Sequence, residues 1–171
     1  MNLYIIGYMG TGKSKFGAAL AELTGSPYID LDDLFESRYH ISISDFFDKY
    51  GEAVFRDLER QLLFETGIAD HAIISTGGGT PCYMDNMDFM LQHGKCIYLK
   101  QDVQVILDRV TVPKRKRPIL KNVPPDELED FITRHLSSRE PFYNRADLIL
   151  EGQEADPAEA LVRLKSLDFL Q

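Results

Sequence analysis

Cysteine is scarce in this sequence, and the histidines are not spaced as metal ligands. The 171 residues include only Cys82 and Cys96, which match no metal-ligand spacing and argue against a disulfide framework. No two of the four histidines stand four residues apart; they are His40, His71, His93 and His135. A zinc site therefore has no support in the sequence.

Long apolar runs and an excess of positive charge are also missing. No hydrophobic stretch approaches the roughly 20 residues of a membrane span, and no signal peptide precedes the first strand-like run. The net charge of -8 argues against nucleic acid or an anionic membrane surface as a partner. We therefore expect a cytoplasmic protein with a single domain over residues 1–171, a length sufficient to bury one substantial core.

A glycine-rich stretch near the start carries the strongest motif. Residues 7–14 read Gly-Tyr-Met-Gly-Thr-Gly-Lys-Ser, after the apolar run 3–6 and before a helical pattern. This order predicts a phosphate-binding loop, because backbone N–H groups and a helix N-terminus attract phosphate oxygens. Lys13 is expected to reach the β- and γ-phosphates, and Ser14 to offer its hydroxyl to Mg²⁺. An ordinary glycine-rich turn is the alternative.

Two carboxylates occur in the next apolar run. Residues 28–32 are predicted as a strand in which Asp30 and Asp32 point to one face. Ligands of open α/β sheets bind at the carboxyl ends of strands, which favours a functional role. In the alternative interpretation Asp32 caps the following helix and its neighbour is merely solvated.

A helix is predicted over about 52–66, after a shorter helix that ends at Gly51. Arg56 and Glu59 are three residues apart, so they could form a pair on its surface. Surface pairs of this kind contribute little to stability, and this purely structural interpretation competes with a functional one for Arg56.

Three consecutive glycines, residues 77–79, follow the apolar run 72–75. Glycine costs conformational entropy, so three in a row favour a close approach of the backbone to a small ligand over a plain flexible turn. Four consecutive basic residues, 114–117, stand out in an otherwise acidic chain. They could form a solvated loop, but in a protein that binds polyphosphate we expect a lid that closes over it.

Five short apolar runs alternate with helical patterns along the chain. They span residues 3–6, 28–32, 72–75, 96–99 and 148–150, and a last helix is predicted to begin at Asp156-Pro157. Buried strands alternating with helices predict an α/β protein with a parallel sheet covered on both faces.

Taken in order, the motifs resemble the shikimate kinase family, within the nucleoside-monophosphate-kinase-like P-loop group. The markers are the loop 7–14, Asp30-Leu31-Asp32, Gly51-Glu52 with Phe55-Arg56 and Glu59, the glycines 77–79, Arg117-Pro118-Ile119-Leu120, and Arg139-Glu140-Pro141-Phe142-Tyr143. The resemblance covers about residues 3–164. It implies a three-layer α/β/α P-loop kinase fold with a five-stranded parallel sheet in the order 2-3-1-4-5, a substrate-binding segment at about 32–62 and a lid at about 111–124.

The resemblance also implies a reaction and an acceptor site. The reaction is transfer of the ATP γ-phosphoryl group to the 3-hydroxyl of shikimate, giving shikimate 3-phosphate and ADP on the route to aromatic amino acids. Asp32 would hold the substrate hydroxyls and orient or deprotonate the attacking one. Arg56 and Arg139 would grip the carboxylate, because guanidinium and carboxylate pair as a bidentate fork. Gly78 and Gly79 would meet the substrate through backbone N–H groups.

On the ATP side, the resemblance implies that Lys13 and Arg117 neutralise charge in the transition state. Arg109 would stack on adenine, with the Pro157 segment on its other side. The residues expected to wrap the phosphates are Gly10, Thr11, Gly12, Lys13, Ser14 and Lys15. The implied cofactor is Mg²⁺, bound by Ser14 with Asp30 helping through water. ATP and shikimate are the expected partners of a monomer, and Glu59 would keep Arg56 in place.

The chain departs from the family pattern at two positions. His40 stands where the family usually has glycine, which bears on the shape of the substrate-binding segment. Ala155 stands where an arginine often precedes the adenine-side proline, so we expect fewer adenine contacts and weaker ATP binding.

Two other functions fit part of the pattern. A small-molecule kinase for another acceptor, such as gluconate, would share the phosphate loop, although the glycines and the spaced arginines favour a cyclic alcohol with a carboxylate. A catalytically silent nucleotide-binding protein is the second alternative. Such a protein would be expected to lose Lys13, Asp32 or Arg117, and all three are present.

Overall fold

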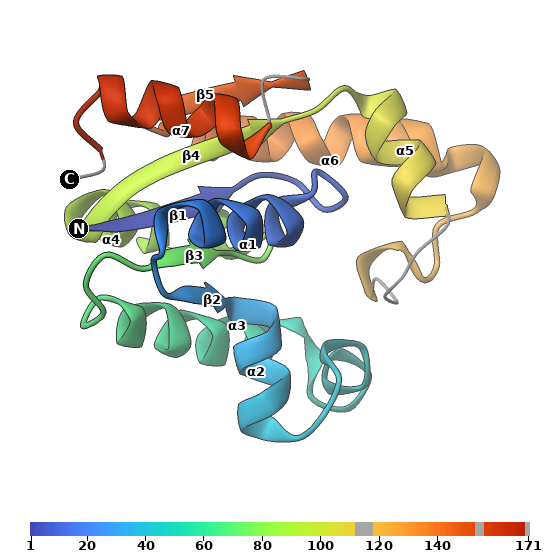
Figure 1. The fold of residues 1–171 in the computed structure, drawn as a ribbon. Helices are drawn as coiled ribbons and strands as arrows, with labels where there is room; N and C mark the ends of the chain where they lie inside the picture. The colour runs from blue at the N-terminus through green and yellow to red at the C-terminus, as the bar shows by residue number, and fades with distance from the viewer. Residues whose placement is uncertain (112–117, 153–155, 170–171) are drawn as a thin grey trace.

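A five-stranded parallel sheet in the order β2-β3-β1-β4-β5 forms the centre of the computed structural model (Figure 1). The structure describes residues 1–111, 118–152 and 156–169. The strands are β1 (Asn2–Ile6), β2 (Tyr28–Asp30), β3 (Ile73–Ser75), β4 (Gly94–Lys100) and β5 (Leu148–Glu151). In the central strand, Tyr4 pairs with Ile74 of β3 on one side and with Cys96 of β4 on the other. The predicted strand order and parallel pairing are confirmed.

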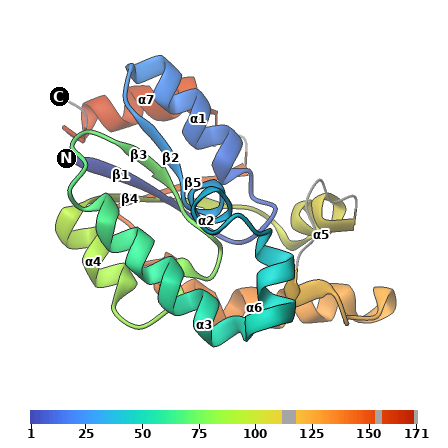
Figure 2. The ribbon, with the colours of Figure 1, turned by 90° about the horizontal axis from the view of Figure 1, so that it is seen from below.

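Helices cover both faces of the sheet, as the sequence pattern predicts. Figure 2 shows α1 and α7 on one face and α3, α4 and α6 on the other, which gives three layers. The helices are α1 (Lys13–Thr24), α2 (Leu31–Tyr39), α3 (Ile43–Thr66), α4 (Asn86–His93), α5 (Val103–Thr111), α6 (Leu128–Tyr143) and α7 (Pro157–Ser166). Short 3-10 turns are η1 (Thr80–Cys82), η2 (Pro118–Leu120) and η3 (Pro125–Glu127).

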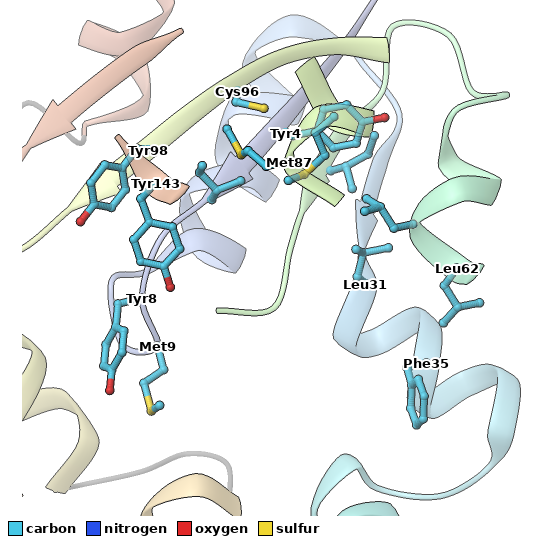
Figure 3. Packing of buried hydrophobic residues seen from close by; sticks show 14 of the residues in the cluster. Tyr4, Tyr8, Met9, Leu31, Phe35, Leu62, Met87, Cys96, Tyr98 and Tyr143 are labelled. Carbon is cyan, nitrogen blue, oxygen red and sulfur yellow. The ribbon is translucent and has the colours of Figure 1, made fainter. Parts of the chain in front are cut away.

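The side chains of β1 divide the core into two parts. Leu3 and Ile5 pack with buried residues of α1 and α7, whereas Tyr4 and Ile6 join the larger cluster with Leu62 of α3 and its neighbours (Figure 3). Successive residues of a strand face opposite sides, so a strand that is apolar at every position must be covered twice. The sheet therefore lies between two helical layers, each packed against one of its apolar faces.

Helix ends follow local sequence signals. Gly25 ends α1 in a left-handed conformation (φ 68), and the Asp156 carboxylate caps α7 by accepting bonds from two backbone N–H groups. Gly51 interrupts α3 with φ 82 and ψ 168, so the two predicted helices meet at the expected residue as one kinked element. His40 ends α2 with φ 54, which a glycine would adopt readily and which costs another residue about 1 kcal/mol.

The prediction of one strand over residues 28–32 is wrong in its second half. Strand β2 ends at Asp30, which lies opposite the last residue of β3, and α2 begins at Leu31. The Asp30 Oδ1 atom accepts bonds from the N–H groups of Asp32 (3.0 Å) and Asp33 (3.4 Å). Asp30, not Asp32, is therefore the helix cap, because the strand has no further partner and aspartate is a favoured capping residue.

Some predictions concern positions outside the described residues. These are the basic run with Arg117 and the departure at Ala155, which stay predictions. Among the helices of the described ranges, none combines the length and the apolar character that a membrane crossing requires.

Candidate active site

A cleft of about 1390 Å³ opens at the carboxyl edge of the sheet, where the chain leaves β1, β2 and β3. Every predicted site residue that the structure describes lines this cleft; they are Gly10, Thr11, Gly12, Lys13, Ser14, Lys15, Asp30, Asp32, Arg56, Gly78, Gly79, Arg109 and Arg139. Residues as far apart in the sequence as Gly10 and Arg139 are thus brought together around one space. Parallel strands produce this convergence because their carboxyl ends meet at one edge.

The loop after β1 curls around the carbonyl oxygen of Tyr8. The Thr11 hydroxyl and the Lys13 ammonium each donate a bond of 2.8 Å to that oxygen. Gly10 and Gly12 have φ values of 79 and 93, which only glycine adopts without strain. This curl presents the N-terminus of α1 to the cleft, an arrangement that suits phosphate.

Oxygen ligands for a divalent cation lie beside the loop. Ser14 is exposed in the first turn of α1, and the Tyr28 hydroxyl lies 3.0 Å from its carbonyl oxygen and 3.3 Å from Asp30 Oδ2. Hydroxyl and carboxylate oxygens are the ligands that Mg²⁺ prefers, together with water and nucleotide phosphates. Within the described ranges, no group of three or more His, Cys, Asp or Glu side chains could hold a metal alone. The donors present therefore fit Mg²⁺ carried by a nucleotide.

Arg56 and Glu59 form a buried ion pair, so the prediction of a surface pair is wrong. Arg56 Nη1 lies 2.7 Å from Glu59 Oε2, and the two residues are 8% and 2% exposed. The other Glu59 oxygen accepts a 2.6 Å bond from the Thr80 hydroxyl in η1. Burial lowers the pKa of Arg56, but the Glu59 charge and bond, with those of the exposed Glu52, outweigh it and raise the pKa. The guanidinium is thus kept charged and fixed at the wall of the cleft.

The glycine run after β3 lies against these charged groups. A side chain at Gly79 would collide with the guanidinium of Arg56, and one at Gly77 would meet Glu59 and approach Asp32 Oδ1 to 3.2 Å. The glycine backbone therefore lies close to charged side chains of the protein itself, and its approach to a small ligand stays a prediction. Any larger residue here would displace the groups that line the cleft.

Arg139 closes the same end of the cleft from α6. Its guanidinium carbon lies 5.7 Å from the centre of the Tyr8 ring, and its side chain is buried. A Cβ atom at Gly78 would lie 3.5 Å from Arg139 Nη1, and the Gly78 carbonyl accepts a 2.6 Å bond from the Tyr143 hydroxyl. Arg56 and Arg139 thus flank the glycines, with their guanidinium nitrogens close to Gly79 and Gly78.

Arg109 lies at the opposite end, beside the phosphate loop. Its Nη1 atom donates a 3.0 Å bond to the Gly10 carbonyl oxygen, and the side chain is otherwise exposed. Asp156 and Pro157, at the start of α7, line the same cleft. Figure 1 shows α5, which carries Arg109, beyond the carboxyl ends of the strands. This arrangement leaves room for a nucleotide base next to the loop.

The model of the shikimate kinase family matches residues 9–168. The chain belongs to the shikimate kinase family. A shikimate kinase from Bacteroides thetaiotaomicron is 42% identical over 156 residues, which cover 91% of this chain and 89% of the relative. The predicted family, fold and enzyme class are thereby confirmed, and phosphorylation of shikimate is the function of the family.

Solved structures of family members have the same fold. The crystal structure of shikimate kinase from Bacteroides thetaiotaomicron is similar to this chain with a TM-score of 0.88 at 39% identity, covering 99% of both chains. Shikimate kinase from Acinetobacter baumannii, in complex with shikimate, gives a TM-score of 0.88 at 32% identity, covering 99% of this chain and 95% of that one.

Sequence analysis assigned no role to two aromatic residues beside the site, Tyr8 and Tyr143. Both lie in motifs that mark the shikimate kinase family. Tyr8 occupies a variable position of the phosphate loop, so the motif gives no signal for it. Tyr143 stands four residues after Arg139, and both lie in α6, so this helical spacing could have indicated a shared face.

Proposed function

We propose that this chain transfers the γ-phosphoryl group of MgATP to the 3-hydroxyl of shikimate. The observation that carries the proposal is the pairing of two unlike sites in one cleft. A phosphate loop lies at one end, and two buried arginines, Arg56 and Arg139, lie at the other. Membership of the shikimate kinase family supports the same reaction.

At the acceptor end, Arg56 and Arg139 bind the carboxylate of shikimate. Guanidinium groups suit this ligand because each can donate two parallel bonds to a carboxylate. The backbone N–H groups of Gly78 and Gly79 contact the substrate, since glycine has no side chain of its own to block this approach. The cyclohexene ring then extends toward Asp32, whose carboxylate holds the hydroxyls and orients or deprotonates the attacking one.

At the donor end, the amides of residues 10–15 and the Lys13 ammonium hold the phosphates. Ser14 would hold Mg²⁺, with Asp30 helping through water, and the ion would supply positive charge next to the phosphates. Arg109 packs against adenine. Arg117, outside the described residues, is proposed to approach the γ-phosphate from the lid. Phosphoryl transfer depends mostly on positioning and electrostatic stabilisation, which is what these groups supply.

We also propose that one chain forms the whole active site as a single domain over residues 1–171. The substrate-binding segment is about 32–62 and the lid about 111–124. Both ends of the cleft can be built from one copy, so the proposed site requires no residue from a second one, and we expect a monomeric enzyme. Light scattering of the purified protein tests this, with 19.5 kDa as the expected monomer mass.

Release of ADP by purified protein tests the reaction. The protein is incubated with MgATP alone, with MgATP and shikimate, and with MgATP and gluconate as the control acceptor. We expect ADP only with shikimate, and NMR of the product is expected to show phosphate on the 3-oxygen. ADP with gluconate instead would indicate another small-molecule kinase. ATP binding without any acceptor-dependent ADP would indicate a silent nucleotide-binding protein.

A further inference from the structure

Tyr8 belongs to the phosphate loop, but its side chain is directed to helix α6. The ring is fully buried, and its hydroxyl lies 2.7 Å from His135 Nδ1. Figure 3 shows the Tyr8 ring next to Met9, with its hydroxyl pointing away from Tyr143 and Tyr98. The backbone carbonyl of the same residue holds Thr11 and Lys13, so Tyr8 contacts both ends of the cleft.

His135 and Arg139 are one helical turn apart and share a face of α6. The Tyr8 ring contacts both of them, edge to face with His135 at 5.5 Å between centroids and beneath the guanidinium of Arg139. Burial, with the nearby positive charge of Arg139, lowers the pKa of His135 to about 4. The imidazole is therefore neutral at pH 7, and Nδ1 can accept the Tyr8 hydroxyl while Nε2 carries the proton.

The two arginines of the acceptor site differ in how they are held. Arg56 is fixed by Glu59 and Glu52. Within residues 1–111, 118–152 and 156–169, Arg139 forms no ion pair with a carboxylate. Among those residues no carboxylate pairs with its charge, and the neighbours that orient it there include the Tyr8 ring.

We propose that Tyr8 and His135 are positioning residues that hold the Arg139 guanidinium in place for the carboxylate of the acceptor. The inference rests on the proposed role of Arg139 in binding that carboxylate. The Tyr8 ring forms the surface on which the guanidinium lies, and the bond to His135 prevents the ring from turning away. Through this pair, the phosphate loop takes part in building the carboxylate site.

Three single variants test the hydrogen bond. Tyr8→Phe removes the hydroxyl and keeps the ring, His135→Leu removes the acceptor, and His135→Asn places an amide oxygen close to the position of Nδ1. One buried hydrogen bond contributes about 1 kcal/mol. Tyr8→Phe and His135→Leu should therefore each raise KM and Kd for shikimate about fivefold. KM for ATP should change by less than about twofold, because backbone amides dominate phosphate binding. His135→Asn should restore most of the shikimate affinity.

A double-mutant cycle separates positioning from general loss of packing. In an Arg139→Lys background, Tyr8→Phe should produce no further loss of shikimate affinity, because the group that it positions is gone. Tyr98→Phe, at another fully buried tyrosine of the same cluster, is the matched control and should leave both KM values unchanged.

Failure of this inference and failure of the proposed function give different results. If Arg139→Lys alone leaves shikimate binding unchanged, the proposed carboxylate site is wrong. If Arg139→Lys weakens binding but Tyr8→Phe does not, or if the two losses simply add, only the positioning role is overturned. Equal increases in KM for both substrates, with a lowered Tm, would also overturn it in favour of a structural role.

Discussion

At the acceptor end of the cleft the two arginines are buried among other side chains, whereas at the phosphate end Lys15 and Arg109 are exposed. Arg56, Glu59 and Arg139 are each less than a tenth exposed. Ser14, Lys15 and Arg109 are exposed. Lys13 and Asp30 are exceptions at the phosphate end, since both are buried; Lys13 donates to a backbone carbonyl, and Asp30 accepts from backbone N–H groups.

The difference follows from the two ligands. A polyphosphate can be bound by backbone N–H groups at a helix start, which need only the loop geometry and no buried charge. A carboxylate on a small ring requires guanidinium groups at fixed positions, and burying them requires partners such as Glu59. Groups already held in place lose less freedom on binding. The buried ion pair therefore holds Arg56 in a fixed position at the acceptor end. Substitution of Arg56 or Glu59 should affect folding as well as binding.

Asp32 lies where the two ends meet, and Asp32→Asn should have the largest effect on turnover. Loss of the carboxylate should lower kcat by about 10²–10⁴-fold, the range for a general base, with Tm nearly unchanged because Asp30 caps α2. Steady-state kinetics and thermal unfolding measure both quantities. Asp33→Asn, at the adjacent exposed carboxylate, is the control and should retain activity. Unfolding of the Asp32 variant would instead assign it a structural role.

Glu59→Gln tests whether the acceptor end depends on its buried ion pair. The change leaves the Arg56 charge without its closest anion, so we expect a loss of about 3 kcal/mol in the free energy of unfolding. For a chain of this size, this lowers Tm by about 6–12 °C.

Glu52→Gln is the matched control, because Glu52 bonds the same guanidinium from an exposed position at 3.3 Å. Loss of the Glu52 charge should lower the free energy of unfolding by less than about 0.5 kcal/mol. Similar losses for the two variants in urea or thermal unfolding would contradict the contrast between buried and exposed charge.

Gly79→Ala tests the close approach of backbone to Arg56. The backbone angles suit alanine (φ -88, ψ -13), but the added methyl group would displace the guanidinium. We expect KM for shikimate to rise about tenfold, corresponding to one charge-assisted hydrogen bond, with KM for ATP unchanged. Gly25→Ala, which meets open space far from the cleft, should lower stability through its positive φ without changing either KM.

Arg109→Ala should affect the opposite end only. Removing an exposed cation beside the loop should raise Kd for ATP about twofold to fivefold, the range of an exposed cation–π contact, while shikimate binding and Tm stay the same. Isothermal titration with each ligand measures this. Arg134→Ala, another exposed arginine, on α6, is the control. Weaker shikimate binding in the Arg109 variant would show that the two ends are not separate.

The smallest effect concerns pH and the acceptor end. The pKa of His135 is about 4 in the folded chain and about 6.5 in the unfolded chain. Between pH 6.5 and 4, therefore, the unfolded state binds a proton at His135 and the folded state does not. Its neutral form therefore stabilises the fold above pH 6.5, and this contribution is lost as the pH falls toward 4. Because His135 is partly exposed, the effect is reduced. Between pH 7.5 and 5, the free energy of unfolding should fall by about 1 kcal/mol more in wild type than in His135→Asn. Equal losses in urea unfolding would contradict the low pKa.

Local motifs explain why much of the site was predictable. The curl of residues 7–14 depends on glycines and a helix start that are adjacent in sequence, so the pattern and the geometry agree. The same reasoning failed at Asp30 and Asp32. The alternation of apolar and acidic residues continues through residue 32, but the strand ends where its neighbour β3 ends, and that limit is not visible in residues 28–32.

Contiguous residues were thus sufficient to establish a parallel α/β protein with a phosphate loop, and the ordered motifs indicated its family. The folded chain was needed to show that Arg56 and Glu59 are buried rather than on the surface, and that Tyr8 reaches His135 across 127 positions. The reason is physical. Backbone conformation depends on neighbouring residues, whereas burial, pKa and hydrogen bonding depend on which distant elements pack together.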